Sequence, residues 1–289
     1  MRGVLNVNKP AGISSYDVIR RVKKRLTQRH RIGHAGTLDP IASGVLLLLF
    51  NEATRVSRYL LGSDKEYLAE LLFGVRTDTD DITGRTIEEK DASGLDRSAV
   101  AGLLSGLTGD IEQVPPRFSA LKQNGTPLYR LARRGVAVEP RPRRVTIRSL
   151  ELVEWRPPRA GIRASVSSGT YVRALARDIG EAAGTGATLS SLVRTRAGMF
   201  DLSSSTSLDR ITESNLEELL VPVDKATTLP QVVVPEATAR RLLNGQQVSS
   251  TEGCQPGTLL ASSGPGRYLA VVVCRHSMLK QQRLVYADM

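Results

Sequence analysis

Three segments of this chain repeat their apolar residues every three or four positions, as the buried side of an amphipathic helix does. They are residues 14–26, 98–107 and 171–183. In the first segment, Ser14 or Ser15 can cap the helix because a side-chain oxygen at that position accepts a free backbone N–H. The sequence therefore predicts three helices that pack one side against a core.

Other segments have the composition and alternation of strands. Residues 66–75 and 161–167 are predicted as strands, and the latter places Ile162, Ala164 and Val166 on one side. The run at 45–50 is apolar throughout and predicts a buried strand. Residues 77–84 are rich in Thr, Asp and Gly and predict a turn.

The pattern changes around residues 222–230, where prolines interrupt the chain. Beyond them we expect a strand over 231–234, a short helix over 236–244, and further strands punctuated by glycine. We therefore divide the chain into a large domain, residues 1–228, and a small β-rich domain, residues 229–289.

One aspartate stands in a loop that carries three glycines. Asp39 precedes Pro40, which disfavours a helical backbone at Asp39. The loop leads directly into the apolar run at 45–50, so the carboxylate would be held by a stiff loop against a buried strand. Such a group is well placed to act as a nucleophile. For the pair of residues alone, an ordinary Asp-Pro turn is the simpler interpretation. The glycines are Gly33, Gly36 and Gly44.

Composition narrows the class of protein. The chain has 289 residues, 40% of them hydrophobic, which is enough for one large core and a small extra module. Its 40 Lys and Arg against 29 Asp and Glu give a net charge of +11, which indicates a polyanionic partner or a merely basic soluble protein. The longest apolar run, residues 45–50, is far below the roughly 20 residues that span a membrane. With no apolar segment near the N-terminus, we expect a cytoplasmic protein without a membrane partner.

The cysteines and histidines do not have the spacing of a metal site. Cys254 and Cys274 are expected to be ordinary reduced residues in or beside strands, because two cysteines do not make a disulfide scaffold. The acidic residues from Asp78 onward do not form a calcium-binding EF-hand loop. Ile82 stands where that loop needs a ligand, and Thr83 stands where it needs a glycine. We therefore expect no metal ion.

Residues 115–148 combine prolines with a high density of arginine. We expect an irregular, partly mobile insertion, because a segment with few core residues is costly to order without a partner. Bound RNA could supply that ordering energy. The arginines are Arg130, Arg133, Arg134, Arg141, Arg143, Arg144 and Arg148.

Five stretches together resemble, in the same order, the motifs of the pseudouridine synthases that modify the T arm of tRNA. The resemblance is strong over residues 1–225 and weak beyond them, and Ile41 stands where the family usually has leucine. Five matches in order are far more specific than one. The stretches are 5–15, 33–44, 65–67, 77–84 and 168–173.

The resemblance implies a fold and an activity. The fold is mixed α/β (α+β) with a largely antiparallel central sheet, in which residues 117–148 form a basic insertion that clamps RNA. The small C-terminal β-rich domain would be a PUA-like RNA-binding domain. The activity is isomerisation of uridine 55 in the T loop of tRNA to pseudouridine, on a base flipped out of the RNA. The reaction is redox-neutral, so no cofactor is expected, and the partner is the T arm of tRNA bound by a monomer.

The same resemblance assigns roles to residues. Asp39 would be the nucleophile, acting at C6 of the uracil or at C1′ of the sugar, and Arg173 would pair with it. Tyr67 would stack on the uracil and assist removal of the C5 proton, and His34 would hold the flipped-out state. Three further residues would support the site or contact RNA, and one of them, Asp81, would buttress Arg173. The three are Lys9, Lys65 and Asp81.

Two other functions fit parts of the pattern. A guide-RNA-dependent relative would share the Asp39 motif but work inside a ribonucleoprotein, and activity on bare tRNA would separate the two. A tRNA-binding or tRNA-folding module would also be basic. It would have no need of Asp39, Tyr67 and Arg173 together.

Overall fold

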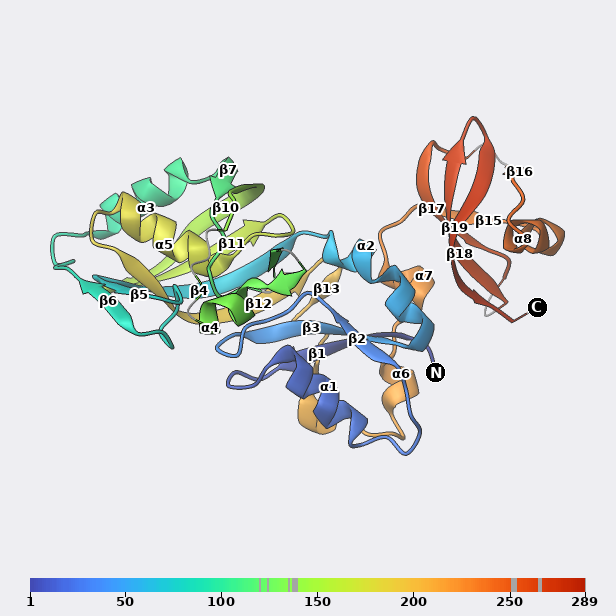
Figure 1. Cartoon of the computed structure of the whole chain (residues 1–289), viewed down its shortest axis with the longest axis horizontal. Coiled ribbons are helices and arrows are strands. Elements are labelled where there is room, and N and C mark those ends of the chain that lie inside the picture. Colours follow the sequence, from blue (N-terminus) through green and yellow to red (C-terminus); the bar gives the residue numbers. More distant parts are fainter. Residues whose placement is uncertain are drawn as a thin grey trace.

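The chain folds around two β-sheets, a large one and a small one near the C-terminus (Figure 1). The computed structural model describes residues 1–119, 121–123, 125–134, 136, 140–250, 254–264 and 267–288. Among these residues, no helix is long and apolar enough to cross a bilayer. The mixed α/β fold with a separate C-terminal β-sheet, expected from the sequence, is confirmed.

The large sheet has the order β14-β1-β3-β12-β4-β11-β10-β7, with β2 paired to β3 and β13 paired to β12. Most neighbours run antiparallel, whereas β1 with β14 and β3 with β12 are parallel. The strands are β1 (Gly3–Lys9), β2 (Ile32–Ala35), β3 (Ser43–Phe50), β4 (Lys65–Phe73), β7 (Gly109–Gln113), β10 (Arg143–Arg156), β11 (Arg159–Val166), β12 (Ala187–Ala197), β13 (Phe200–Asp201) and β14 (Thr206–Ser207).

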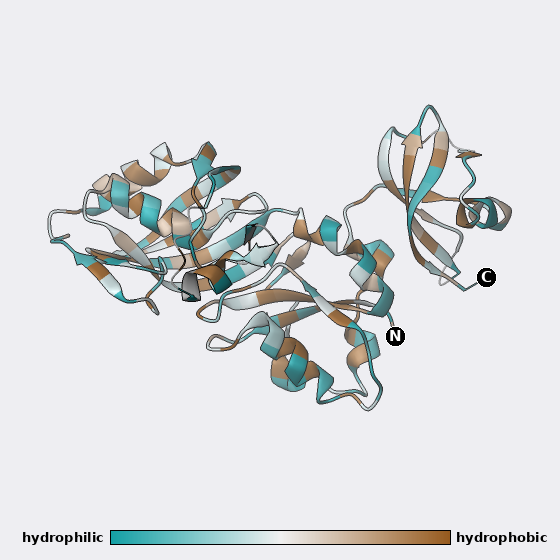
Figure 2. Ribbon diagram, viewed as in Figure 1, coloured by the Kyte–Doolittle hydropathy of each residue, from teal (hydrophilic) through white to brown (hydrophobic). Residues whose placement is uncertain are grey.

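Strand β3 explains the apolar run of the sequence, because both of its faces are buried. Leu46, Leu48 and Phe50 belong to one apolar cluster with the helices α1 (Ser15–Lys23), α3 (Arg97–Gly106) and α5 (Val172–Ala182). The intervening residues of β3 belong to a second cluster with η1 (Asn51–Val56), α2 (Ser57–Leu61) and α7 (Val223–Ala226). The helices of the first cluster show bands of both colours in Figure 2, as amphipathic helices on a sheet do.

The C-terminal sheet has the order β15-β17-β18-β19-β16 and is covered by α8 (Glu236–Leu243). It docks on the large domain through the second cluster, and Arg55 of η1 donates to the carbonyl of Val285 at 2.7 Å. The strands are β15 (Gln231–Val233), β16 (Val248–Ser249), β17 (Gly257–Ser262), β18 (Tyr268–Arg275) and β19 (Met278–Ala287).

Several short elements connect these parts. An acidic turn joins β5 (Val75–Thr77) to β6 (Thr86–Glu89), which pair with each other. Between β14 and α7 lie η2 (Leu208–Arg210) and α6 (Leu216–Leu219).

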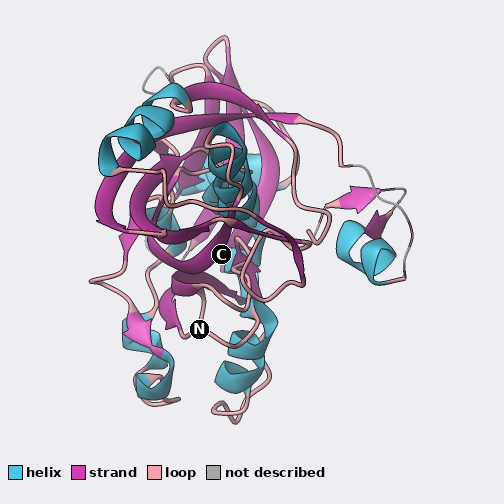
Figure 3. Cartoon of the chain, turned by 90° about the vertical axis from the view of Figure 1, so that its left-hand side faces the viewer, coloured by secondary structure: helices cyan, strands magenta, loops and turns pink. Residues whose placement is uncertain are grey.

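The basic insertion is less irregular than the sequence predicted. Its described part contains β8 (Lys122–Gln123), β9 (Thr126–Pro127) and α4 (Leu128–Arg133), which stand apart from the large sheet in Figure 3. The end of the predicted insertion, from Arg143 onward, is instead strand β10 of that sheet. The many arginines of this segment hid the alternation of buried and exposed residues that is typical of a strand. Val145 and Ile147 are buried, whereas Arg144 is exposed. Residues 120, 124, 135 and 137–139 of the predicted insertion lie outside the described residues.

The two cysteines are not the ordinary reduced residues that the sequence predicted. The structure joins Cys254 to Cys274 of β18 in a disulfide, with Cα atoms 6.2 Å apart. That separation is within the range a disulfide can bridge. Sequence spacing could not show it, because the loop before β17 returns to β18 only in the folded domain.

Candidate active site

The Asp39 loop connects β2 to β3 and is fixed by close approach of the backbone. A Cβ atom at Gly44 would lie 2.3 Å from the carbonyl oxygen of Arg194 in β12, so only glycine fits there. Gly36 and Gly44 also have φ angles of +90° and +99°, which disfavour other residues. The N–H of Ala42 donates to the carbonyl of Asp39 at 3.0 Å and closes the turn around Pro40.

The segment from β1 to α1 holds this loop from its other side. Lys9 is fully buried, and its Nζ donates to the carbonyls of Ala42 at 2.6 Å and Pro10 at 2.9 Å. The N–H of Gly12 donates to the carbonyl of Pro40 at 2.7 Å. The sequence predicted Lys9 as an RNA contact or a support. The structure places it beneath the loop, where its contacts support the backbone.

Asp39 and Arg173 form the ion pair that the sequence predicted. Arg173 Nε donates to Asp39 Oδ2 at 2.8 Å, and Nη2 donates to Oδ1 at 3.3 Å. The arginine side chain is 5% exposed, whereas that of Asp39 is 36% exposed. The pair therefore aims a carboxylate that solvent, and hence a ligand, can reach.

Arg173 also joins two other segments to Asp39. It donates to the carbonyl of Thr79 in the acidic turn and to the carbonyl of Phe118, both at 2.9 Å. Asp81 Oδ2 lies 3.7 Å from Arg173 Nε, beside the arginine as predicted. The other oxygen of Asp81 accepts from the N–H of Thr83 at 3.0 Å, so its own turn orients the carboxylate.

Tyr67 lies in β4 and is only 8% exposed. It opposes Arg194 of β12 in the sheet and belongs to the apolar cluster that contains Leu38, the residue before Asp39. The ring therefore lies on the core side of the site. Its predicted stacking on uracil stays a prediction.

Three buried cations surround the loop, and the charge of Arg194 contributes to a lowered pKa of both lysines. Arg194 is 1% exposed and donates to the carbonyls of Val45 at 2.7 Å and Gly36 at 3.0 Å. Burial lowers the pKa of Lys9 to about 8, although the nearby Asp39 acts in the opposite direction. Burial and the charge of Arg194 lower the pKa of Lys65 to about 8. Lys65 donates to the carbonyls of Leu61 and Ser63, so it too supports the backbone.

His34 on β2 is held in its neutral form. Burial, and then the charge of Arg194, lower the pKa of this histidine. Within the described part of the chain, its buried Nδ1 has no hydrogen-bond partner. The predicted RNA contact of His34 stays a prediction.

Sequence reasoning missed several residues that shape the site. Gln113 is fully buried, accepts from the N–H of Tyr171 at 2.8 Å and donates to its carbonyl at 3.2 Å, which fixes the start of α5. The other two residues are Arg177 in α5 and Arg194 in β12. A charged residue inside a helix or strand was the only signal in the sequence, because the partners of both arginines come from distant segments.

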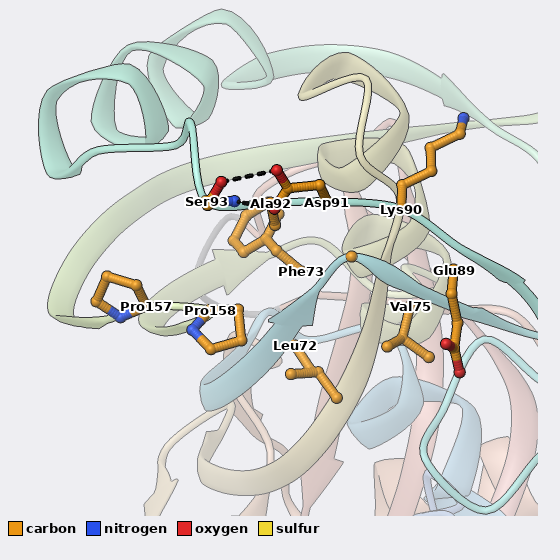
Figure 4. Close-up of a pocket in the computed structure, with 11 residues that line it drawn as sticks. Leu72, Phe73, Val75, Glu89, Lys90, Asp91, Ala92, Ser93, Pro157 and Pro158 are labelled. Carbon is orange, nitrogen blue, oxygen red and sulfur yellow. Dashed lines mark hydrogen bonds between the residues drawn. The ribbon is translucent and has the colours of Figure 1, made fainter.

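A cavity of about 700 Å³ lies at the other end of β4 and is separate from this site. Leu72 and Phe73 of β4, Ala92 and the turn at Pro157 and Pro158 line it (Figure 4). Leu72 and Phe73 stand five and six residues after Tyr67 in β4, and a strand advances about 3.3 Å per residue, so the cavity is well separated from Tyr67. Among the described residues, no group of His, Cys, Asp or Glu is arranged to hold a metal ion.

Comparison with known proteins gives one consistent family. Residues 23–172 match the TruB family pseudouridylate synthase N-terminal domain, and residues 173–228 match the tRNA pseudouridylate synthase B C-terminal domain. The tRNA pseudouridine synthase B of Burkholderia mallei (strain NCTC 10247) is 43% identical over 98% of this chain and 96% of its own length. That of Symbiobacterium thermophilum is 47% identical over 84% of this chain and 82% of its own length. Among solved structures, a chain of a Cbf5-Nop10-Gar1 complex matches with a TM-score of 0.75 and 25% identity, over 99% of this chain and 85% of that chain.

Proposed function

Because the chain belongs to the TruB family of pseudouridine synthases and is an isomerase that acts on tRNA, we propose that it modifies uridine 55 of the T loop with Asp39 as nucleophile. The observation that carries this proposal is the ion pair between the accessible Asp39 and the buried Arg173. A nucleophilic carboxylate must be aimed and reachable, and the contact with Arg173 and the exposure of Asp39 meet these two conditions.

The reaction breaks the N1–C1′ bond of uridine, turns the uracil and joins C5 to C1′. The carboxylate of Asp39 attacks C6 of the base or C1′ of the sugar, and both routes require the nucleotide to leave the RNA stack. Arg173 holds the carboxylate in place. Tyr67 stacks on the base and assists loss of the C5 proton, and the neutral His34 fills space near the vacated stack. Each step uses side chains of this chain alone.

Two basic surfaces are suited to the RNA backbone, since phosphates attract Lys and Arg without regard to sequence. One is the exposed side of α1, next to the Asp39 loop, with Arg20, Arg21, Lys23 and Lys24. The other is in the domain at residues 229–289, where a cavity of about 610 Å³ is lined by Arg275, Lys280 and three glutamines. We propose that both surfaces bind tRNA and that the basic insertion clamps its T arm.

The experiment is to map pseudouridine in a tRNA transcript treated with the purified chain and no other RNA. A carbodiimide adduct at pseudouridine stops reverse transcription and gives its position. We expect one new stop, at position 55, and none in a matched transcript with cytidine at that position. Modification at another uridine would contradict the assigned position. Modification only after a guide RNA is added would favour a ribonucleoprotein subunit.

A further inference from the structure

Arg177 lies one helical turn after Arg173 on α5, and its contacts repeat those of Arg173 one turn along the helix. Arg177 Nη2 donates to the carbonyl of Val114 at 2.8 Å, and Nη1 lies 3.2 Å from Asp80 Oδ2. Arg173 makes the corresponding contacts with Phe118 and Thr79. Each arginine therefore ties the acidic turn to the segment that leads from β7 into the basic insertion.

Asp80 occupies a strained position in that turn. Its φ angle is +60°, a left-handed conformation that is strained for a residue with a side chain and persists where its surroundings hold it. The N–H of Leu189 donates to the Asp80 carbonyl at 3.1 Å, and that of Ile82 donates to the Leu189 carbonyl at 2.9 Å. The backbone of the turn is thus held by β12, and its carboxylate by Arg177.

The groups facing Arg177 are nearly enclosed. The side chains of Arg177 and Asp80 are 17% and 16% exposed, and that of Asp178, which also accepts from Arg177, is 23% exposed. Burial raises the pKa of Asp80 and of Asp178, and the charge of Arg177 opposes that rise in both. An ion pair in such a place fixes geometry, because losing one member leaves the other charge buried without its partner.

We propose that Arg177 and Asp80 are positioning residues for the Asp39–Arg173 pair. They hold the acidic turn so that the Thr79 carbonyl and Asp81 stay against Arg173. They also hold Val114 so that Phe118 reaches the same guanidinium. The inference rests on the proposed function, because Asp39 must be the reacting group for its alignment to matter.

The test compares three variants with the wild type in single-turnover pseudouridine formation on a tRNA transcript. Asp80→Asn keeps the shape of the side chain and removes its charge. Asp80→Gly removes the carboxylate but adopts the left-handed backbone without strain. Arg177→Lys keeps the charge but cannot reach Asp80 and Val114 together. Arg163→Met is the matched control, since Arg163 pairs with Glu151 at 3.4 Å on the exposed side of β11.

We expect the rate constant of both Asp80 variants to fall by about tenfold or more, because small displacements of reacting groups cost that much. The dissociation constant of Asp80→Gly for tRNA should stay near that of the wild type, and its loss of rate should exceed what any fall in melting temperature accounts for. Arg177→Lys should be intermediate, and Arg163→Met unchanged.

A full rate for Asp80→Gly, or rates that fall only in step with melting temperature, would overturn the inference. Absence of pseudouridine with the wild-type protein would instead count against the proposed function itself.

Discussion

The hydroxyl of Ser15 forms hydrogen bonds with both the N–H and the carbonyl of Leu38, the residue before Asp39. It accepts from the Leu38 N–H at 2.8 Å and donates to the Leu38 carbonyl at 3.0 Å. Ser15 is 2% exposed and Leu38 is 3% exposed, so water cannot replace either bond. The first residue of α1 is thereby fastened to the loop that carries the nucleophile.

Replacing Ser15 with alanine should weaken both folding and catalysis. Two buried backbone groups would lose their partner, and we expect the free energy of unfolding in urea to fall by about 1–3 kcal/mol. Turnover should fall as well, because the loop before Asp39 would be free to shift. Ser105→Ala is the control, since that exposed helical hydroxyl donates only to the carbonyl of Ala101. Equal stability losses in the two variants would contradict the role of Ser15.

The buried Lys9 predicts a specific dependence of stability on pH. Its pKa is about 8 in the folded chain against 10.5 for the free side chain, so between these values the unfolded chain binds more protons. Stability due to Lys9 therefore rises with pH across that window, by at most about 1.4 kcal/mol per pH unit. The measurement is the difference in unfolding free energy between wild type and Lys9→Met at pH 7.5 and 9.5.

That difference should favour the wild type more at the higher pH. Other groups titrate in both proteins and cancel in the comparison. A difference that is constant, or that falls with pH, would show that Lys9 keeps its ordinary proton affinity in the folded chain.

The disulfide predicts that reductant weakens the C-terminal domain. The two cysteines are 20 residues apart, and closing a loop of that size stabilises a fold by about 3 kcal/mol in the chain-entropy account. Cys254→Ser should lower the melting transition of that domain, and dithiothreitol should then have no further effect. Alkylation of both thiols in the unreduced, denatured protein would show that the bond is absent.

The sequence predicted the elements that have a clear period and the residues that lie in specific motifs. Helix α5 and strand β3 follow from local patterns, whereas the Asp39–Arg173 contact was expected from the resemblance to a known family, whose motifs contain both residues. In contrast, the first residues of β10, up to Arg148, were assigned to the insertion because of their arginines, although Arg144 and Arg148 are exposed residues of a strand, where charge is compatible with a sheet.

The supporting contacts could not be predicted, because they join segments distant in the chain. Arg194 reaches Gly36 across 158 residues, and Arg177 reaches Asp80 across 97. Nothing local to either arginine indicates an acceptor. The buried positions of Lys9 and Lys65 were missed for a related reason: their partners are backbone carbonyls, which every sequence contains.

The central claim is that Asp39 is the nucleophile of uridine isomerisation. The most direct measurement is release of tritium from a tRNA transcript labelled at C5 of uridine, comparing the wild type with Asp39→Asn, because joining C5 to C1′ must expel that label. The account predicts release by the wild type, none by the variant, and similar binding of tRNA by both. Tritium release by Asp39→Asn at a rate near that of the wild type would contradict it.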